Sequence, residues 1–363
     1  MKKYNKQLIK LKPNRVYRPF LGGLSIDVWE GKEQQVDGHF GERWIASLVN
    51  ARNDGDPSLE GLSVIEDKEE QTLKSMVELN PVGMLGQAHV DSYGTSLAIL
   101  VKALDAYSRL LIQVHPDKAR AKELFDSEYG KTEAWYIIGT RVIDDVEPFI
   151  LLGFKEGVTR EWYEEQFHKQ DIEALENCMH RIKVQVGDLY IIPGGTPHAL
   201  GSGCFLIEIQ EPTDFTIRSE VLAASGEPLA EALIHQGLGF KRMFECYDYT
   251  SHDEAALLSN YKLEPRVLSS LDGNVEIALI DEAFFSMTKR VITSTMKIQR
   301  QGAFEILLIL KGEGLLVDDG EVIKVQQGDE FFMPHGVKSV EVRNLASTSM
   351  EVISCLPPKA FSK

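Results

Sequence analysis

Gln113 and His115 occupy alternate positions in an apolar run, and both residue types can bind a metal. Side chains two positions apart project from the same face of a β-strand, so both could reach one ion. Glu133 lies just ahead of another apolar run, and His198 lies in a glycine-rich turn. One glutamine oxygen, two imidazoles and one carboxylate form a mixed oxygen and nitrogen ligand set. We expect this set to bind Zn²⁺ or another borderline divalent metal and to leave one coordination position open.

The turn that carries His198 belongs to a pattern that occurs twice. Residues 187–198 read GDLYIIPGGTPH and residues 328–339 read GDEFFMPHGVKS, so they share Gly-Asp, Pro-x-Gly and a variable last position. The pattern resembles the second motif of the cupin jelly roll, in which the last residue points into the barrel. The first copy ends in His198 and the second in Ser339, so only the first copy is predicted to hold metal. His335, inside the second copy, is interpreted as an ordinary turn residue.

The elements around these motifs predict a mainly β protein with helical insertions, built from two cupin-like jelly-roll units. We expect a metal-binding catalytic cupin domain at residues 1–220, with a helical insertion at about 153–180. A helical connecting segment is expected at 221–270, and a cupin-like domain without metal ligands at 271–363. Short strands are predicted at 304–310, 314–317, 322–325 and 331–333, because apolar runs there are separated by turn residues.

Three local patterns make further predictions. Thr159 and Asp171 are typical helix N-caps, so each should begin a helix of the insertion. The apolar residues of 95–106 recur at helical spacing, which predicts an amphipathic helix. The tryptophans Trp44, Trp135 and Trp162 are interpreted as core residues.

Composition narrows the class of protein. The chain has 39 Lys and Arg residues against 55 Asp and Glu, a net charge of −16, which repels nucleic-acid backbones and anionic lipid surfaces. We therefore expect no nucleic-acid partner. No apolar segment approaches the length that spans a membrane, and no secretory signal is apparent. The four cysteines form no CxxC pair, which fits a reducing compartment, so a cytoplasmic protein is expected.

A family resemblance strengthens the metal hypothesis. Residues 113–117 (QVHPD), 130–136 (GKTEAWY), 193–199 (PGGTPHA) and 208–218 (EIQEPTDFTIR) resemble, in order and spacing, the signature segments of type I mannose-6-phosphate isomerase. Segments around residues 22–23, 42–44 and 100–105 also look like the N-terminal portion of that family. The resemblance implies an enzyme of mannose metabolism that interconverts mannose 6-phosphate and fructose 6-phosphate through an enediol-type intermediate.

The resemblance also implies roles for individual residues. The zinc ligands, for one ion per chain, would be Gln113, His115, Glu133 and His198. Lys131 and Arg218 match basic active-site positions, and Glu208 and Asp214 match acidic ones. No glycine-rich nucleotide loop has the required spacing, so no nucleotide cofactor is expected. A sugar phosphate is the expected partner, and the sequence is compatible with a monomer or a homodimer.

Several alternatives stay open at this stage. A metal-bound water, Glu208, Asp214 or Lys131 could each move the proton. Leu21 stands where the family usually has a tryptophan that forms an aromatic wall beside the sugar, and Phe20 could replace that wall. Leu111 stands where a small hydroxyl residue is common. The alternative function is therefore a non-catalytic, regulatory cupin that binds a sugar phosphate. An iron-dependent cupin oxygenase is disfavoured, because Lys131 and Arg218 point to an anionic substrate.

Overall fold

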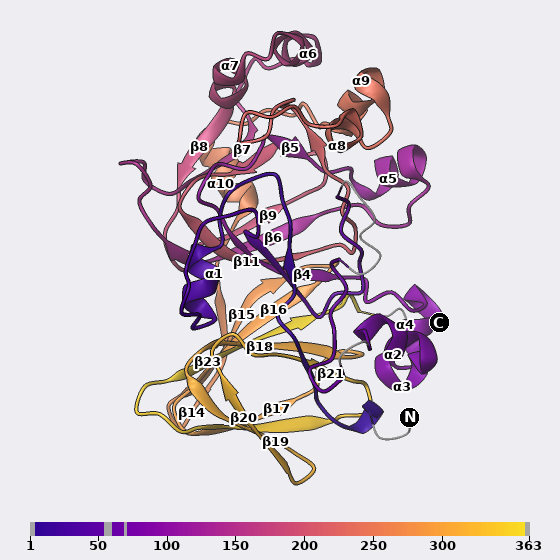
Figure 1. The fold of residues 1–363 in the computed structure, drawn as a ribbon, viewed down its shortest axis with the longest axis vertical. Coiled ribbons are helices and arrows are strands. Elements are labelled where there is room, and N and C mark those ends of the chain that lie inside the picture. The colour runs from indigo at the N-terminus through magenta and orange to yellow at the C-terminus, as the bar shows by residue number, and fades with distance from the viewer. Residues whose placement is uncertain (1–3, 54–59, 69–70, 360–363) are drawn as a thin grey trace.

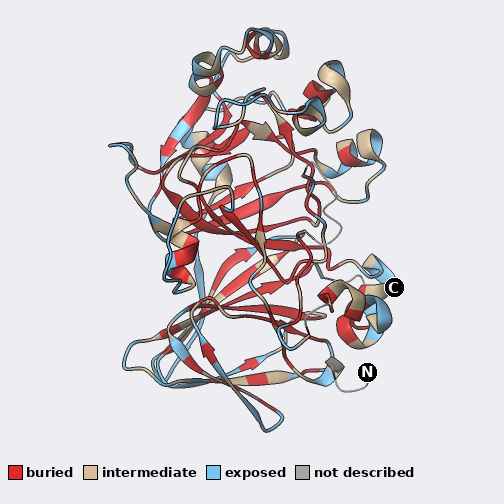
Figure 2. Ribbon diagram, viewed as in Figure 1, coloured by how far each residue is buried: buried red, intermediate tan, exposed pale blue. Residues whose placement is uncertain are grey.

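The computed structural model describes residues 4–53, 60–68 and 71–359, which form two β units stacked along the long axis of the molecule (Figure 1). Each unit consists of two antiparallel sheets, and buried residues concentrate between the sheets (Figure 2). The mainly β architecture predicted from the sequence is confirmed. No helix within these described ranges is both long and apolar enough to cross a membrane.

The first unit contains a seven-stranded sheet, ordered β13-β9-β6-β11-β4-β3-β2, and a five-stranded sheet, ordered β12-β5-β10-β7-β8. Its strands are β2 (Arg15–Val16), β3 (Glu42–Ile45), β4 (Leu100–Asp105), β5 (Gln113–Val114), β6 (Glu133–Thr140), β7 (Phe149–Phe154), β8 (Met179–Lys183), β9 (Leu189–Ile192), β10 (His198–Leu200), β11 (Cys204–Gln210), β12 (Ile217–Arg218) and β13 (Lys262–Leu263).

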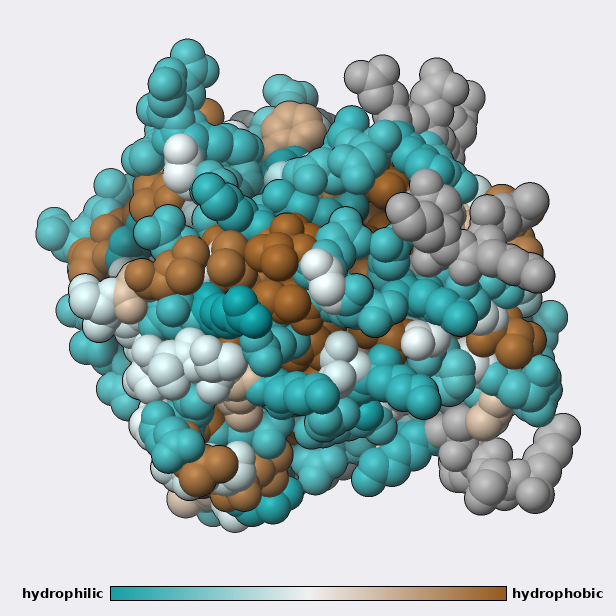
Figure 3. Space-filling view, turned by 90° about the horizontal axis from the view of Figure 1, so that it is seen from below, coloured by the Kyte–Doolittle hydropathy of each residue, from teal (hydrophilic) through white to brown (hydrophobic). Residues whose placement is uncertain are grey.

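The second unit contains a seven-stranded sheet, ordered β1-β21-β18-β23-β16-β15-β14, and a four-stranded sheet, ordered β17-β22-β19-β20. Its strands are β1 (Ile9–Leu11), β14 (Arg266–Leu271), β15 (Asn274–Asp281), β16 (Ser286–Ile292), β17 (Thr295–Gln299), β18 (Glu305–Lys311), β19 (Glu313–Asp318), β20 (Glu321–Gln326), β21 (Glu330–Met333), β22 (Ser339–Asn344) and β23 (Met350–Leu356). Seen from below, this end of the molecule is largely hydrophilic, with a hydrophobic band near the middle (Figure 3).

The helices lie outside the sheets (Figure 1). They are η1 (Tyr4–Lys6), α1 (Leu24–Trp29), α2 (Leu73–Leu79), α3 (Pro81–Leu85), α4 (Gln87–Tyr93), α5 (Lys118–Phe125), α6 (Arg160–Lys169), α7 (Ile172–Asn177), α8 (Glu231–His235), α9 (Gly239–Arg242), η2 (Met243–Cys246) and α10 (Glu254–Tyr261). The two predicted caps are confirmed. Thr159 accepts a hydrogen bond from the backbone of Trp162 at the start of α6, and Asp171 accepts one from Ala174 at the start of α7.

The repeated pattern occupies equivalent places in the two units. Gly187 and Gly328 adopt φ values of 100° and 91°, a backbone conformation that glycine adopts without strain. The last positions, His198 and Ser339, are the first residues of β10 and β22. The four short strands predicted in the second unit are present as β18 to β21.

The prediction of a helix at 95–106 is wrong. Leu100–Asp105 form the strand β4, which lies between β11 and β3 and is buried along its whole length. A strand buried on both faces carries apolar residues without strict alternation, so a short apolar run does not separate it from a helix. The chain also enters the second sheet system early, because β1 pairs with β21 although it lies near the N-terminus.

Candidate functional site

His115, Glu133 and His198 form a buried group, here called the metal group. Their possible ligand atoms all lie within 4.8 Å of one another. Glu133 begins β6 of the seven-stranded sheet, whereas His198 begins β10 of the five-stranded sheet, so the group lies between the two sheets. In the described part of the chain, no second group of three such residues has this geometry. Gln113 is paired in register with His198, and the side-chain nitrogen of Gln113 lies 3.2 Å from His198 Nε2.

Both histidines are oriented for metal binding. His115 Nδ1 donates to the carbonyl oxygen of Phe215 at 2.7 Å, and His198 Nδ1 donates to that of Thr196 at 2.9 Å. Carbonyl oxygens only accept hydrogen bonds, so the proton of each ring is on Nδ1 and Nε2 keeps its lone pair. The Nε2 atoms lie 3.1 Å and 3.3 Å from the Glu133 carboxylate.

The electrostatics of the group also suit a metal. Burial, followed by the nearby charge of Lys131, lowers the pKa of His115 to about 3, and burial lowers the pKa of His198. Both rings are therefore neutral at neutral pH, as metal ligation requires. Glu133 Oε1 is buried and accepts no hydrogen bond within the described residues. Two nitrogen lone pairs and an unsatisfied carboxylate oxygen thus face one point, and a cation relieves their repulsion.

Lys131 supplies a positive charge beside this group. Its ammonium nitrogen lies 2.7 Å from His115 Nε2 and forms an ion pair with Glu133. Lys131 also lines the neighbouring pocket. Since the ammonium group competes for the same atoms, ligation of a metal by His115 and Glu133 requires Lys131 to turn towards this pocket.

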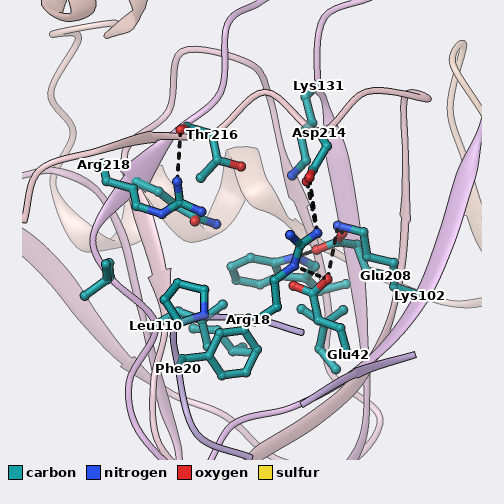
Figure 4. A pocket seen from close by; sticks show the side chains of 16 residues that line it. Arg18, Phe20, Glu42, Lys102, Leu110, Lys131, Glu208, Asp214, Thr216 and Arg218 are labelled. Atoms are coloured by element: carbon teal, nitrogen blue, oxygen red, sulfur yellow. Dashed lines mark hydrogen bonds and ion pairs between the residues drawn. The ribbon is translucent and has the colours of Figure 1, made fainter. Parts of the chain in front are cut away.

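The pocket next to the metal group is walled by both sheets of the first unit (Figure 4). On the seven-stranded sheet, Trp135, Glu208, Lys102 and Trp44 stand side by side on neighbouring strands. Glu208 accepts a hydrogen bond from Trp135 Nε1 at 3.1 Å and forms an ion pair with Lys102 at 3.2 Å. Burial, followed by the charge of Glu133, raises the pKa of Glu208.

Arg18 binds two carboxylates of the pocket. Its Nε donates to Glu42 at 2.9 Å, and its Nη2 donates to Asp214 at 3.2 Å. The guanidinium also lies 5.1 Å from the ring centre of Trp44. Burial raises the pKa of Glu42 and Asp214, but Arg18 and Lys102 outweigh burial, so the pKa of each carboxyl is lowered. Both groups are therefore held ionised.

Arg218 differs from the other cations of the pocket. It lies on β12, opposite Gln113 in register, and faces Lys131 and Asp214 across the pocket (Figure 4). Its Nη1 donates to the carbonyl oxygen of Leu233, and no carboxylate among the described residues lies within ion-pair distance. Burial, followed by the charge of Arg18, lowers the pKa of Arg218 to about 10, so it remains charged at neutral pH. Arg218 is thus a cation available to an anionic ligand.

The structure brings together all eight site residues predicted from the sequence. Three of them form the metal group, and five line the adjoining pocket, namely Gln113, Lys131, Glu208, Asp214 and Arg218. Phe20 and Leu111 line the pocket as well. Trp135 is buried, as predicted for a core residue, and it also lines the pocket.

The pocket has three further charged residues for which no role was predicted from the sequence, namely Arg18, Glu42 and Lys102. Lys102 was hidden by the erroneous helix prediction at 95–106. In a strand, an isolated lysine in an apolar run would have stood out as a buried charge.

Comparison with known proteins agrees with this geometry. Residues 59–133 match the model of the phosphomannose isomerase type I catalytic domain, and residues 275–353 match that of the mannose-6-phosphate isomerase cupin domain. The chain resembles the type I mannose-6-phosphate isomerases in sequence and in fold.

Individual relatives show the extent of the similarity to mannose-6-phosphate isomerases. Mannose-6-phosphate isomerase ManA of Bacillus subtilis is 28% identical over 253 residues, which are 70% of this chain and 74% of the relative. The mannose-6-phosphate isomerase of Streptococcus mutans is 28% identical over 263 residues, which are 71% of this chain and 76% of the relative. The crystal structure of mannose 6-phosphate isomerase from Bacillus subtilis superposes with a TM-score of 0.74 at 23% identity, covering 96% of this chain and 99% of that chain.

Proposed function

We propose that the protein is a zinc-dependent aldose–ketose isomerase that interconverts mannose 6-phosphate and fructose 6-phosphate through an enediol-type intermediate. The observation that carries the proposal is the buried group of His115, Glu133 and His198 beside a pocket that contains Arg218, an arginine with no ion-pair partner among the described residues. The related proteins named above carry this activity in their names.

The donor set suits one Zn²⁺ per chain, held by Gln113, His115, Glu133 and His198. Two imidazole nitrogens with neutral rings, one carboxylate and one amide oxygen are the ligand types that a catalytic zinc accepts. When bound, the zinc polarises the carbonyl group of the sugar and stabilises the negative charge that develops on its oxygen. Hydrogen bonds from Nδ1 to backbone carbonyls hold both imidazoles in the orientation that ligation needs.

The charged pocket residues divide the remaining tasks. Arg218 binds the phosphate group, because it is the pocket cation that no described carboxylate neutralises. Lys131 contacts the sugar oxygens once it has turned towards the pocket, and Lys102 fixes the position of Glu208.

Glu208 is the preferred carrier of the proton between C2 and C1 of the sugar. Its raised pKa brings it closer to neutral pH, which suits a group that must both accept and donate a proton. Asp214 is less suited to this task because Arg18 lowers its pKa. Asp214 instead holds Arg18 beside the sugar site.

The decisive experiment measures fructose 6-phosphate formation from mannose 6-phosphate in a coupled assay, before and after chelation and after zinc is restored. Turnover that is lost with the chelator and regained with zinc is the expected result. In parallel, His198→Ala should lose both bound zinc, measured by elemental analysis, and turnover. His180→Ala is the matched control, because His180 is a buried histidine of the same unit whose ring bonds to the carbonyl of His252 and lies outside the group of His115, Glu133 and His198.

A non-catalytic, regulatory cupin that binds a sugar phosphate is the alternative function. Leu111 favours it, because this apolar side chain stands in the pocket wall. Binding of mannose 6-phosphate by zinc-loaded protein without turnover would establish the alternative, whereas full turnover by metal-free protein would overturn both proposals. The four cysteines are all buried and free, which supports a cytoplasmic location.

A further inference from the structure

A second cavity lies apart from the pocket described above. It is bounded by α3 and α4 on one side and by β14, β15 and β16 of the second unit on the other, and it has a volume of about 450 Å³. This is within the range of about 300–1,000 Å³ that is typical of small-molecule sites. The two cavities share no lining residue, so a ligand here would not touch the metal group.

The floor of the second cavity is apolar. Ala278 and Ile280 project from β15, Leu356 ends β23, and Leu85 ends α3. All four residues are buried in the protein. A ligand with an apolar body would cover the apolar surface that these residues still expose in the cavity, which is favourable.

Arg300 provides an unneutralised positive charge in the cavity wall. Its Nε donates to the carbonyl oxygen of Val337 at 3.0 Å, and its Nη1 donates to the carbonyl oxygens of Gly302 and Ala303. No carboxylate of the described residues forms an ion pair with it. Burial lowers the pKa of Arg300, which Glu305 only partly offsets. A partly desolvated guanidinium without a counter-ion is a site that an anion stabilises.

The other charged groups of the wall add to this positive potential. Arg266 and Lys359 also line the cavity, and Asp281 is the one carboxylate among the described lining residues. Asp281 is paired with Arg266 at 3.5 Å. Two cationic charges therefore remain in excess, although the whole chain carries a net charge of −16.

His89 is a buried polar residue in the wall of the cavity. It lines the cavity, is 1% exposed, and donates from Nε2 to the carbonyl oxygen of Ser96 at 2.8 Å. Its Nδ1 is buried and has no hydrogen-bond partner within the described residues. An unsatisfied buried nitrogen is uncommon in folded proteins. Because its lone pair repels an anion, the anionic group of a ligand would lie at Arg300 and not at His89.

We propose that this cavity is a second ligand site, which binds a small organic anion consisting of a phosphate or carboxylate group on an apolar body. The anionic group lies against Arg300, and the body rests on Ala278, Ile280 and Leu356. Because α3–α4 form one wall and the sheet of the second unit forms the other, the bound ligand joins segments that are far apart in the sequence.

The test uses the full chain and calorimetric titration with phenyl phosphate, benzoate and inorganic phosphate. Phenyl phosphate or benzoate should bind more tightly than inorganic phosphate, because only the first two have an apolar body. Arg300→Gln should weaken the binding about tenfold or more, the change expected for loss of a charge-assisted hydrogen bond. Arg343→Gln is the control, because Arg343 is an exposed arginine of the same unit that is paired with Glu341 and lines neither cavity.

Two further variants make the result decisive. Ala88→Trp fills the mouth of the cavity from an exposed position of α4 and should abolish binding while every cation is retained, even if Arg300→Gln fails to fold. Arg218→Gln should leave the second site intact, so binding that is lost with Arg218→Gln but kept with Arg300→Gln would assign the anion to the first pocket and overturn the proposal. Absence of binding by both organic anions at millimolar concentration would also overturn it. None of these readouts depends on isomerase activity.

Discussion

At the scale of single residues, the pairing of charges decides which groups are free to act. Four cations line the pocket beside the metal group. Arg18 is paired with Glu42 and Asp214, Lys102 with Glu208, and Lys131 with Glu133. The fourth, Arg218, bonds to backbone carbonyls and so keeps its charge for a ligand.

The role of Arg218 can be tested by substitution. Arg218→Gln should raise KM for mannose 6-phosphate and lower kcat/KM roughly tenfold to a hundredfold, because a charge-assisted contact contributes about 1.5–3 kcal/mol. Slow isomerisation of unphosphorylated mannose, measured as the formation of fructose, should change little. An equal loss for both sugars would show that Arg218 does not read the phosphate, and Arg218→Lys should restore part of the affinity.

Arg18 should control the pH dependence of stability. Its removal in Arg18→Met leaves Glu42 and Asp214 buried without this partner, and we expect a loss of about 3–5 kcal/mol of unfolding free energy at about pH 7. The pKa values of both carboxyls are lowered in the folded protein, from 4.5 for Glu42 and 3.8 for Asp214. Their contribution to stability is therefore present above these values and is lost as the pH falls through the lowered pKa values.

In the Arg18→Met variant this dependence is weakened or reversed, because burial then raises both pKa values. The difference in stability between wild type and variant should thus be largest near neutral pH. It should shrink on acidification, first as the pH falls through the raised pKa values of the variant and then as it falls through the lowered pKa values of the wild type. Urea unfolding at a series of pH values measures it. A difference that stays constant with pH would contradict the role of Arg18, and Arg343→Met provides the reference for loss of an exposed arginine.

At the scale of elements, the register of short strands assembles the site. β5 pairs with both β10 and β12, which places Gln113 opposite His198 on one side and opposite Arg218 on the other. Glu208 stands opposite Lys102 in the pairing of β11 with β4. The proposed metal ligand Gln113 and the arginine proposed to bind phosphate are therefore neighbours on one sheet, whereas Glu208, the proposed proton carrier, lies on the facing sheet.

The helical insertion should contribute to stability but not to catalysis. Thr159 caps α6 through a hydrogen bond to Trp162, and neither α6 nor α7 supplies a residue to the pocket. Thr159→Ala should lower the unfolding free energy by about 1 kcal/mol, the usual effect of losing an N-cap. The value of kcat should be unchanged, and Thr159→Ser should behave as wild type. A large loss of turnover in Thr159→Ala at full zinc occupancy would show that the insertion takes part in catalysis.

At the scale of the whole molecule, buried polar contacts join the two β units. Arg43 of β3 is fully buried and binds Glu330 of β21 at 2.7 Å and the carbonyl oxygen of Gly328 at 2.7 Å. Trp29 Nε1 donates to the carbonyl oxygen of Leu310 at 2.9 Å. Together with the pairing of β1 to β21, these contacts stabilise the first unit through the second.

Loss of the Arg43 contact should therefore destabilise the entire protein. Arg43→Met leaves Glu330 buried without its partner, and we expect a loss of about 3–5 kcal/mol. Arg343→Met, which removes only an exposed ion pair, should change stability by no more than about 1 kcal/mol. Thermal and urea unfolding of both variants measure the difference. If Arg43→Met were as stable as Arg343→Met, the Arg43 contact would not hold the two units together.

The local chemistry of the sequence was sufficient for much of the prediction. The alternation of Gln113 and His115 gave the first two candidate metal ligands, and the repeated Gly-Asp and Pro-x-Gly pattern located His198 and the jelly-roll turns. These features depend on the geometry of a few consecutive residues, so sequence alone determines them. The family resemblance then added Lys131, Glu208 and the other acidic and basic candidates.

Other features were decided only by the tertiary structure. Leu100–Asp105 form a strand that pairs with β11 and β3 along its two edges and is buried on both faces, and no local pattern reveals these contacts. The pairing of Arg18 with Asp214 joins residues 196 positions apart. The sequence could therefore not show that Arg18 is paired with carboxylates whereas Arg218 has no carboxylate partner among the described residues. The second cavity likewise exists only because α3 and α4 lie against the sheet of a distant segment. Charge pairing and cavities depend on which surfaces meet, and those contacts form only when the whole chain has folded.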